Sequence, residues 1–404
     1  VWKRLGIFSI TAILVVGMAA CSGDSGSSGG ASGVTNSAGE TVDLPEIKLE
    51  NKKVVILTQS STLENHTFTE NFGGEIELVT AADSELYTKF MSMAMGGEAP
   101  DLFQQYLQPS LIVKNYLQPV DEWVDLTSPL WQDVKDANDR IAYKGSHYSA
   151  ITSPSYGGVC WYNKEIFDEY GYDTPQKLLD EGNWTWDTFR DLALKLTVDA
   201  DKDGMPELWG ACINEVDMFL YSCGKHVVSF NPEGKAINNI KSEEIARAMS
   251  FYVDINDKDF CIYAGADGTD KFAQGNVAMI TGGQWYYMIF PDLLKNNTVG
   301  IVPFPRDPNT DTYYMQESVY GWTIPKDAKN PEGGGAFILA ARYDSLREDL
   351  KFQDPDSPWT KEWDDAWQAN LDKIKPVGVP ISYISFQITD FYGDIFARPR
   401  DGEP

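Results

Sequence analysis

The chain could do its chemistry with carboxylates, amides and aromatic rings, because histidine is almost absent. The 404 residues include 60 Asp and Glu and only 3 His, together with 12 Trp, 20 Tyr and 19 Phe. Imidazole is the commonest acid-base group and metal ligand, so its scarcity argues against such catalysis. Aromatic rings can pack against the C–H faces of a sugar. The net charge of −27 disfavours nucleic acid as a partner, since phosphate binding depends on Lys and Arg.

One acidic segment has the spacing of a calcium loop. Asp199, Asp201 and Asp203 occupy positions 1, 3 and 5, and Glu207 falls at position 9. Position 12 is Gly210, so the bidentate Glu of an EF-hand is missing. Two interpretations stay open: a solvated acidic turn, or a structural calcium site formed by these four carboxylates. No cofactor is required by any motif in the chain.

The N-terminus is typical of export. Lys3 and Arg4 precede an apolar run over residues 5–20, which predicts a secretory signal peptide over residues 1–20. Met18-Ala19-Ala20-Cys21 resembles a bacterial lipobox, which implies that Cys21 carries a lipid. Residues 21–45 are rich in Ser and Gly and predict a flexible tether. We therefore expect an extracytoplasmic lipoprotein anchored to the outer face of the bacterial cytoplasmic membrane.

The other cysteines lie in apolar surroundings and form no C-x-x-C motif. Their spacing is compatible with four buried thiols or with a disulfide between Cys212 and Cys223. These residues are Cys160, Cys212, Cys223 and Cys261.

Hydrophobic patterns predict two α/β lobes. The first series is a strand over 53–57, a strand over 75–79, a helix from Asp83 to Gly96, and a strand over 101–103, which together indicate a βαβ unit with a parallel sheet. The second series contains strands over 159–162, 277–280 and 300–302. Its helices begin after Asn163, Thr185 and Ser242, which are all favourable N-cap residues.

Several segments, in order along residues 50–345, resemble family 1 extracellular solute-binding proteins. These are the sugar-capturing lipoproteins of ABC importers, related to maltose-binding protein. The segment 158–167 is similar to the family's "YNK..F" motif, and 184–189 to its "TWDEF" helix start. The other similar segments are 196–210, 272–279, 302–305 and 321–325.

The resemblance implies a two-lobe clamp of the periplasmic-binding-protein type II, with each lobe a sheet flanked by helices. We expect residues 46–154 and 306–345 in the N-terminal lobe, and 155–305 and 346–404 in the C-terminal lobe. The chain would cross between lobes near 153–158, 305–313 and 344–354. The family continues past residue 404, so we expect a C-terminal lobe that is cut short.

The resemblance also implies a function. A monomeric, non-enzymatic protein would hold a carbohydrate, such as an oligosaccharide, between its lobes and deliver it to the permease subunits of an ABC transporter. Ligands of open α/β sheets bind beyond the carboxyl ends of strands, so polar and aromatic residues there are the candidate contacts. They are Gln59, Ser60, Gln104, Gln105, Tyr156, Asp217, Gln284, Trp285, Tyr286, Glu317, Tyr320 and Trp322.

Two alternatives stay open. A secreted carbohydrate-active enzyme needs only a pair of carboxylates, which an acidic chain can supply. The same clamp could instead bind ferric iron, because Tyr286-Tyr287 and Tyr313-Tyr314 resemble the paired tyrosinates of ferric-binding relatives.

Overall fold

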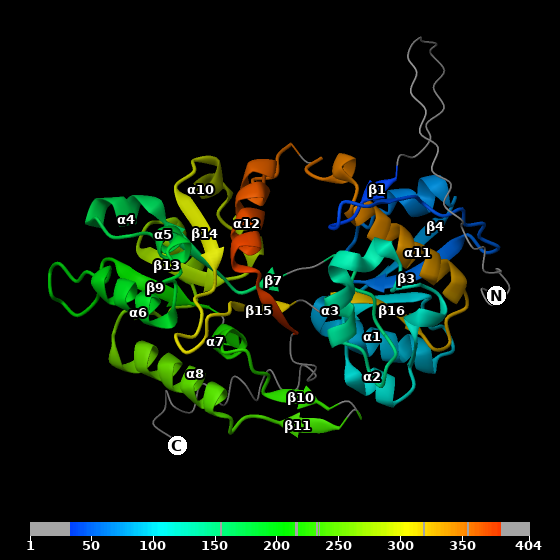
Figure 1. The fold of residues 1–404 in the computed structure, drawn as a ribbon, viewed down its shortest axis with the longest axis horizontal. Helices are drawn as coiled ribbons and strands as arrows, with labels where there is room; N and C mark the ends of the chain where they lie inside the picture. The colour runs from blue at the N-terminus through cyan, green and yellow to red at the C-terminus, as the bar shows by residue number, and fades with distance from the viewer. Residues whose placement is uncertain are drawn as a thin grey trace, which may run out of the picture.

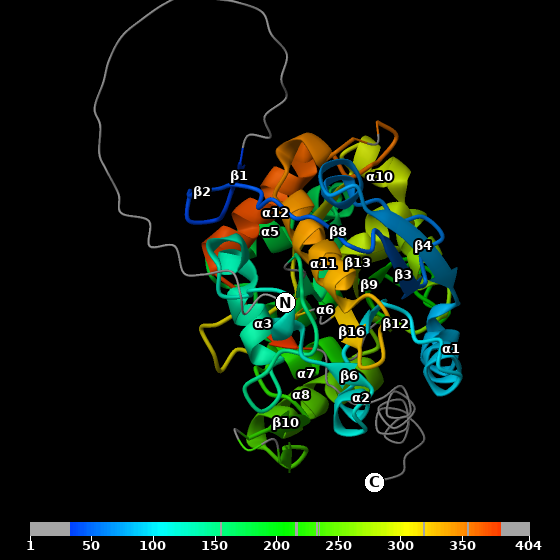
Figure 2. The same ribbon diagram turned by 90° about the vertical axis from the view of Figure 1, so that its right-hand side faces the viewer.

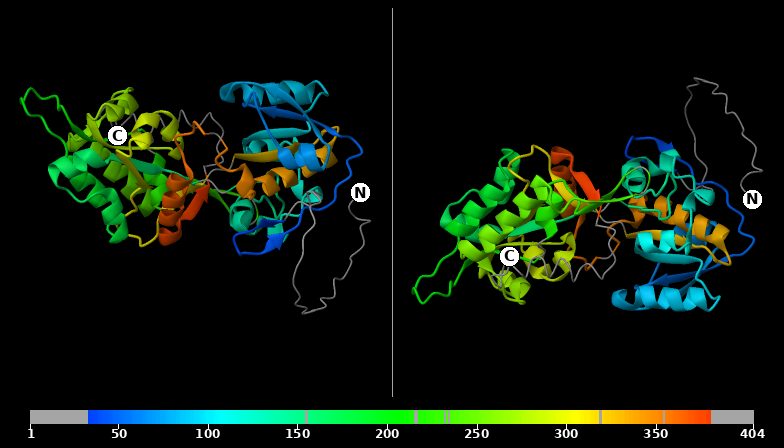
Figure 3. Two further views of the ribbon diagram at one scale, coloured as in Figure 1. Left: turned by 90° about the horizontal axis from the view of Figure 1, so that it is seen from above. Right: turned by 90° about the horizontal axis from the view of Figure 1, so that it is seen from below.

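The computed structural model describes residues 33–153, 156–214, 217–231, 233, 235–317, 320–353 and 355–380. Two lobes lie side by side and are joined by a narrow middle (Figures 1 and 3). The predicted signal peptide and Cys21 lie outside the described residues.

The N-terminal lobe is built on a five-stranded sheet in the order β4-β3-β5-β16-β6. Strands β3 and β4 pair in parallel, β3 and β5 pair in parallel, and β16 runs antiparallel to β5. The βαβ unit predicted from the sequence is therefore confirmed. The bounds are β3 Lys53–Thr58, β4 Glu75–Thr80, β5 Leu102–Tyr106, β6 Leu117–Gln118 and β16 Tyr320–Pro325.

Helices cover both faces of this sheet (Figure 2). Helix α11, Pro331–Ser345, packs on one face, where Phe337 and Ile338 are fully buried. Helix α1, Asp83–Met95, packs on the other face through Leu86 and Phe90, as its predicted apolar stripe requires. The remaining elements are η2 Thr67–Asn71, α2 Pro109–Val113, η3 Val120–Glu122, η4 Pro129–Val134 and α3 Lys135–Arg140.

The segment 33–45 is not a tether, which corrects the sequence prediction for that part of residues 21–45. It forms a small hairpin, β1 Val34–Thr35 with β2 Thr41–Val42, on the N-terminal lobe. Val34 is only 6% exposed and joins the core cluster, and the Asn36 side chain donates a hydrogen bond to the Pro129 carbonyl at 3.0 Å. Apolar residues spaced along this Ser- and Gly-rich stretch give it a face to bury.

The C-terminal lobe has a mixed five-stranded sheet in the order β12-β9-β13-β8-β14. Its central strand β13 pairs in parallel with β9 and antiparallel with β8. The bounds are β8 Val159–Asn163, β9 Trp209–Ile213, β12 Ile262–Tyr263, β13 Val277–Gly282 and β14 Val299–Pro303. All the residues of β8, β13 and β14 are buried, which suits a sheet covered on both faces.

The predicted N-caps of this lobe are confirmed. The side chains of Asn163, Thr185 and Ser242 accept backbone hydrogen bonds at the starts of α4 Lys164–Tyr170, α6 Trp186–Lys195 and α8 Glu243–Val253. The other helices are α5 Pro175–Asp180, α7 Asp217–Ser222, α9 Gly268–Ala273, α10 Pro291–Lys295 and α12 Lys361–Ile374, with η5 Asp254–Lys258, η6 Gln284–Met288 and η7 Glu348–Leu350. A hairpin of β10 Val228–Phe230 and β11 Ala236–Asn238 extends from this lobe (Figure 1).

Between the lobes lies a three-stranded hinge sheet in the order β17-β15-β7. It consists of β7 Tyr156–Gly157, β15 Tyr314–Glu317 and β17 Val377–Pro380. Strand β15 pairs antiparallel with β7 and parallel with β17. The first crossing between the lobes runs through β7, within the predicted range.

The second crossing comes later than the sequence predicted. Residues 306–313 contact the C-terminal lobe, although the sequence predicted that they belong to the N-terminal lobe. The Arg306 carbonyl accepts a bond from the Trp186 amide at 3.0 Å, and the Tyr313 hydroxyl donates to the Trp184 carbonyl at 3.0 Å. The chain is therefore still outside the N-terminal sheet at β15, and it is part of that sheet at β16. The third crossing lies between Leu346, which packs on the N-terminal core, and Trp359, which packs in the C-terminal core.

The four cysteines of the described chain are free and buried, so the disulfide alternative for Cys212 and Cys223 is wrong. Burial raises the pKa of the Cys212 and Cys261 thiols to about 12 and that of Cys223 to about 11. Across the described ranges, helices long and apolar enough to cross a bilayer are absent.

Candidate functional site

The carboxyl ends of both sheets adjoin the hinge, and strand register shows this directly. In the N-terminal lobe, the last residue of β5, Tyr106, pairs with Tyr320, which follows hinge strand β15 closely in sequence. In the C-terminal lobe, the last residue of β13, Gly282, pairs with Val159, which follows hinge strand β7. Polar residues at these ends are thus placed where the lobes meet.

The N-terminal edge gathers the predicted Gln59, Ser60, Gln104 and Gln105. Gln59 and Ser60 follow β3, and both remain accessible to solvent. The Thr58 hydroxyl donates to Gln104 Oε1 at 2.8 Å, which ties the end of β3 to β5. The structure therefore brings these four residues to one edge.

Gln105 is the most unusual of this group. Its side chain is 4% exposed, and its Nε2 has no hydrogen-bond partner among the described residues. A buried polar group without a partner costs about 1–3 kcal/mol. Such an amide is suited to donate to a hydroxyl group or a water molecule at this edge of the sheet.

Trp322 and Tyr320 lie on the neighbouring strand β16. Trp322 is 5% exposed and meets Phe337 edge-on, with ring centroids 4.9 Å apart. It belongs to the core that α11 covers, so its indole has almost no free face to offer a ligand. Tyr320 is partly exposed beside the end of β5.

The C-terminal edge gathers Gln284, Trp285 and Tyr286 after β13. Trp285 is 51% exposed and stands edge-on against Tyr286, with ring centroids 4.7 Å apart. Tyr286 is 4% exposed, and its hydroxyl accepts a hydrogen bond from Asn214 Nδ2 at 3.0 Å. The buried Tyr286 ring thus packs against Trp285, whose indole remains half exposed to solvent. Gln284 is partly exposed beside it.

Asp217 lies at the same edge, because it begins α7 after β9, the parallel neighbour of β13. Burial raises the pKa of its carboxyl group, and hydrogen bonds from the local backbone and from Tyr221 oppose that rise. Asn214, which sequence reasoning missed, links the two loops at this edge. Only its position just after a strand could have pointed to it.

Tyr156 and Glu317 lie instead in the hinge. They pair across β7 and β15 and line a cavity of about 390 Å³ with Asp133, Asp136, Arg140 and Gly378. Glu317 is 1% exposed and accepts two bonds from Arg140, from Nε to Oε2 at 2.9 Å and from Nη2 to Oε1 at 2.5 Å.

This ion pair affects the titration of the cavity. The hydrogen bond to Glu317 raises the pKa of Arg140, and burial followed by the nearby Glu317 charge raises the pKa of Tyr156. The predicted residues at the two strand edges do not line this cavity. They are Gln59, Ser60, Gln104, Gln105, Asp217, Gln284, Trp285 and Tyr286. The structure therefore separates the predicted site into two strand edges and a hinge group.

The tyrosines proposed for iron are used in packing. Tyr313 is 6% exposed with its hydroxyl bonded to Trp184, and burial raises its pKa to about 12. Tyr287 packs against Trp359 at 5.4 Å. Burial at Tyr313 disfavours the ionised form that binding of ferric iron requires.

The acidic loop partly fits a cation site. Carboxylate oxygens of Asp199, Asp201 and Glu207 lie within 4.8 Å of one another. Asp203 is not part of this group, and its Oδ1 accepts a bond from the Met205 amide at 2.7 Å. Glu207 Oε2 accepts from the Ala200 amide at 2.8 Å, and this bond contributes most to the lowered pKa of Glu207.

A family model described as bacterial extracellular solute-binding protein matches residues 66–350. Among solved structures, an ABC substrate-binding protein from Listeria monocytogenes in complex with cycloalternan is similar, with 19% identity, a TM-score of 0.63, and coverage of 88% of this chain and 95% of that chain. The sugar-binding protein MalE from Xanthomonas citri is also similar, with 15% identity, a TM-score of 0.65, and coverage of 87% of this chain and 93% of that chain. A Thermotoga lettingae solute-binding protein bound to α-D-tagatose has 22% identity, a TM-score of 0.60, and coverage of 88% of this chain and 95% of that chain. At these identities, the similarities establish the two-lobe fold.

Proposed function

Because the chain belongs to the bacterial extracellular solute-binding proteins, we propose that its solute is a carbohydrate, most simply an oligosaccharide, which it delivers to the permease of an ABC transporter. Family membership makes the protein an extracytoplasmic binding protein and not an enzyme. The family does not specify the solute, and we propose that it is a carbohydrate. Structural relatives with cycloalternan and α-D-tagatose bound support it.

The observation that carries the proposal is the half-exposed Trp285 at the carboxyl end of β13. An exposed indole at the end of a strand offers a flat apolar face on which a ligand can pack. An indole face held upright by Tyr286 matches the C–H face of a pyranose ring. Gln284 and Asp217 lie nearby on the same edge and can bond to the hydroxyl rim of that ring.

The N-terminal edge would complete the site. When the lobes rotate about the hinge sheet, Gln59, Ser60, Gln104 and Gln105 approach the sugar from the other side. The Gln105 amide, which has no partner among the described residues, would then donate to a hydroxyl of the bound sugar. A ligand that contacts both edges favours the closed arrangement and shifts the population toward it.

Thermal-shift measurements followed by calorimetry test this proposal. The purified protein would be screened with maltotriose, maltotetraose, cycloalternan, D-tagatose and D-mannitol, because a ligand of the folded state raises the melting temperature by mass action. A sugar that binds and is recovered intact supports the proposal. If no carbohydrate in a broader panel shifts the melting temperature, the cargo is of another class. Release of shorter products would contradict the proposal that the protein only binds and delivers the sugar.

We further propose that the protein works as a monomeric lipoprotein. The motif Met18-Ala19-Ala20-Cys21 and the basic, apolar residues before it support lipid attachment at Cys21. Radiolabelled palmitate should label the wild type in a bacterial host and not Cys21→Ala. Sedimentation of the lipid-free protein should give the mass of one chain, which without the signal peptide lies slightly below the 45.1 kDa of all 404 residues.

A structural calcium ion in the acidic loop is a separate proposal. The approach of Asp199, Asp201 and Glu207 supports it, since hard carboxylate oxygens are the ligands that calcium prefers. Adding calcium to chelator-treated protein should raise its melting temperature, and Asp201→Asn should remove that rise. An identical melting temperature with and without calcium would leave the loop as a solvated turn.

A further inference from the structure

The hinge cavity has walls that belong to different lobes. One wall is the Asp133, Asp136 and Arg140 surface of η4 and α3, which are parts of the N-terminal lobe. The opposite wall includes Val377 and Gly378, which follow α12. Helix α12 packs in the C-terminal core through Trp367 and Leu371. Any rotation of the lobes must therefore change the distance between these two walls.

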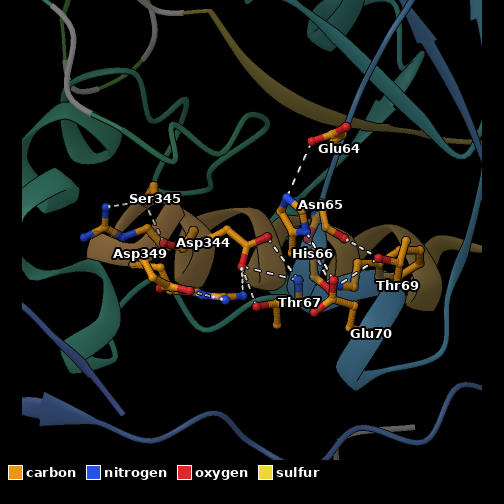
Figure 4. Close-up of polar contacts among 12 residues, drawn as sticks. Glu64, Asn65, His66, Thr67, Thr69, Glu70, Asp344, Ser345 and Asp349 are labelled. Atoms are coloured by element: carbon orange, nitrogen blue, oxygen red, sulfur yellow. Dashed lines mark hydrogen bonds and ion pairs between the residues drawn. The ribbon is translucent and has the colours of Figure 1, made fainter. Parts of the chain in front are cut away.

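The segments that enter the hinge are firmly fixed to the N-terminal lobe. At the first crossing, the Thr152 carbonyl accepts bonds from Arg342 Nη1 at 2.8 Å and from the Ser345 hydroxyl at 3.1 Å. At the third crossing, the Asp344 carboxylate accepts bonds from the Thr67 amide and hydroxyl, at 3.1 and 2.5 Å (Figure 4). Rotation must therefore occur on the hinge side of these anchored residues.

The hinge strand β15 is attached to the C-terminal lobe. Helix α7 packs on it, and a Cβ at Gly224 would lie 2.6 Å from the Tyr314 ring, so the two approach closely. Strand β15 also pairs with β17, which continues from α12. Glu317 at the end of β15 thus moves with the C-terminal lobe, whereas Arg140 moves with the N-terminal lobe.

The Arg140–Glu317 contact spans that division. The Glu317 side chain is 2% exposed and that of Arg140 is 32% exposed. A Cβ at residue 378 would lie 2.5 Å from Glu317 Oε1, so Gly378 leaves space for the carboxylate against β17. A forked, two-bond contact of this kind has strict geometric demands, because both N–H groups must align with both oxygens. It can form only over a narrow range of lobe angles.

We infer that the Arg140–Glu317 pair is an interlobe tie that sets the resting angle of the clamp, with Arg140 a positioning residue for solute capture. Breaking the tie by rotation leaves a nearly buried carboxylate without its partner, which is strongly unfavourable. The tie thus concentrates the free protein near one angle. Solute affinity depends on the population of the binding-competent angle, so the tie also tunes affinity without touching the ligand.

The experiment compares Arg140→Gln with a matched control inside one lobe. Arg247 and Asp307 form a similar forked pair, with side chains 35% and 1% exposed, but both partners lie in the C-terminal lobe. Small-angle X-ray scattering of the sugar-free proteins reports the lobe arrangement. We expect Arg140→Gln to change the interlobe distance distribution and Arg247→Gln to leave it as in the wild type, although both lower the melting temperature.

Arg140→Lys keeps the positive charge but cannot make the two-bond contact with Glu317. It replaces Arg140→Gln in the experiment if that variant does not fold. It should give a distribution between those of the wild type and Arg140→Gln. The inference is overturned if either folded Arg140 variant scatters like the wild type, or if Arg247→Gln changes the distribution equally.

Affinity provides the second readout. The inference rests on the clamp of the proposed function, and predicts that Arg140→Gln changes the Kd for the bound sugar at least threefold while Arg247→Gln changes it less than twofold. An unchanged Kd in Arg140→Gln would contradict it. If the wild type binds no sugar, the proposed cargo fails, but the scattering comparison still decides on the tie.

Discussion

Replacement of Trp285 by alanine tests the placement of the sugar site most directly. The indole is 51% exposed, so of roughly 250 Å² of side-chain surface about 125 Å² is open to a ligand. A stacked sugar would cover about half of that open area. At ~25 cal/mol per Å², the lost contact is worth ~1.5 kcal/mol, which corresponds to about a tenfold increase in Kd.

The measurement is an isothermal titration with the sugar that gives the largest thermal shift. Trp285→Ala should weaken binding at least tenfold, and Trp285→Phe should lose less because it keeps a flat ring. Both variants should unfold cooperatively, since the exposed part of the indole contributes little to the core.

Phe260→Ala is the matched control. Phe260 is 58% exposed and leans on Trp209 with ring centroids 5.3 Å apart, so it is also an exposed aromatic residue supported by another ring. It precedes β12, which runs parallel to β9, and therefore lies at the opposite, amino edge of the sheet. Its removal should leave affinity unchanged. Unchanged affinity in Trp285→Ala, or an equal loss in Phe260→Ala, would refute the placement of the site.

Three further predictions concern stability and reactivity. In Gly210→Ala the new Cβ would lie 1.8 Å from the Ala193 carbonyl oxygen of α6, so we expect a free energy of unfolding lower by about 3 kcal/mol or more in a urea titration; wild-type stability would contradict this close approach. Burial lowers the pKa of His226 from 6.5 to about 4, so the unfolded chain binds the proton first, and stability should fall as the pH drops from about 6.5 to 4; His226→Gln should reduce that slope in melting curves, and an equal slope would assign it to other groups. The buried thiols of Cys160, Cys212, Cys223 and Cys261 should resist a thiol reagent at pH 8 until denaturant is added. Rapid labelling of the native protein would show that the structure around the labelled cysteine opens readily.

Local signals in the sequence predicted the main elements well. Each N-cap was identified from one polar residue before an apolar pattern, because the cap depends on contacts within three residues. The central strands are short apolar runs with few other ways to be buried. The parallel β3–β5 pairing followed from the intervening helix.

The hinge could not be predicted in the same way. Its strands have two to four residues, too few for a hydrophobic period, and β15 pairs with β17 although some sixty residues separate them. Arg140 carries no sequence signal that points to Glu317. The N-terminal hairpin was missed because Gly and Ser dominate its composition, although Val34 decides its packing.

The candidate contacts show a similar division. A position after a strand predicts the edge at which a residue lies, and Gln104 and Trp285 lie at the expected edges. It does not predict which face of the sheet a side chain takes. The prediction for Trp322 failed for this reason, because its side chain lies in the core. Contact of these residues with a sugar stays a prediction.

The late second crossing has a consequence for how the chain folds during export. The C-terminal sheet is assembled from the continuous stretch between β8 and β14, whereas the N-terminal sheet needs β16 to pair with β5, more than two hundred residues earlier. During export the N-terminal end of the chain emerges first. The N-terminal lobe is therefore the first lobe to start folding, but its sheet is completed after that of the C-terminal lobe. Strand β5 has one edge unpaired until β16 arrives, and such an edge can pair with other chains.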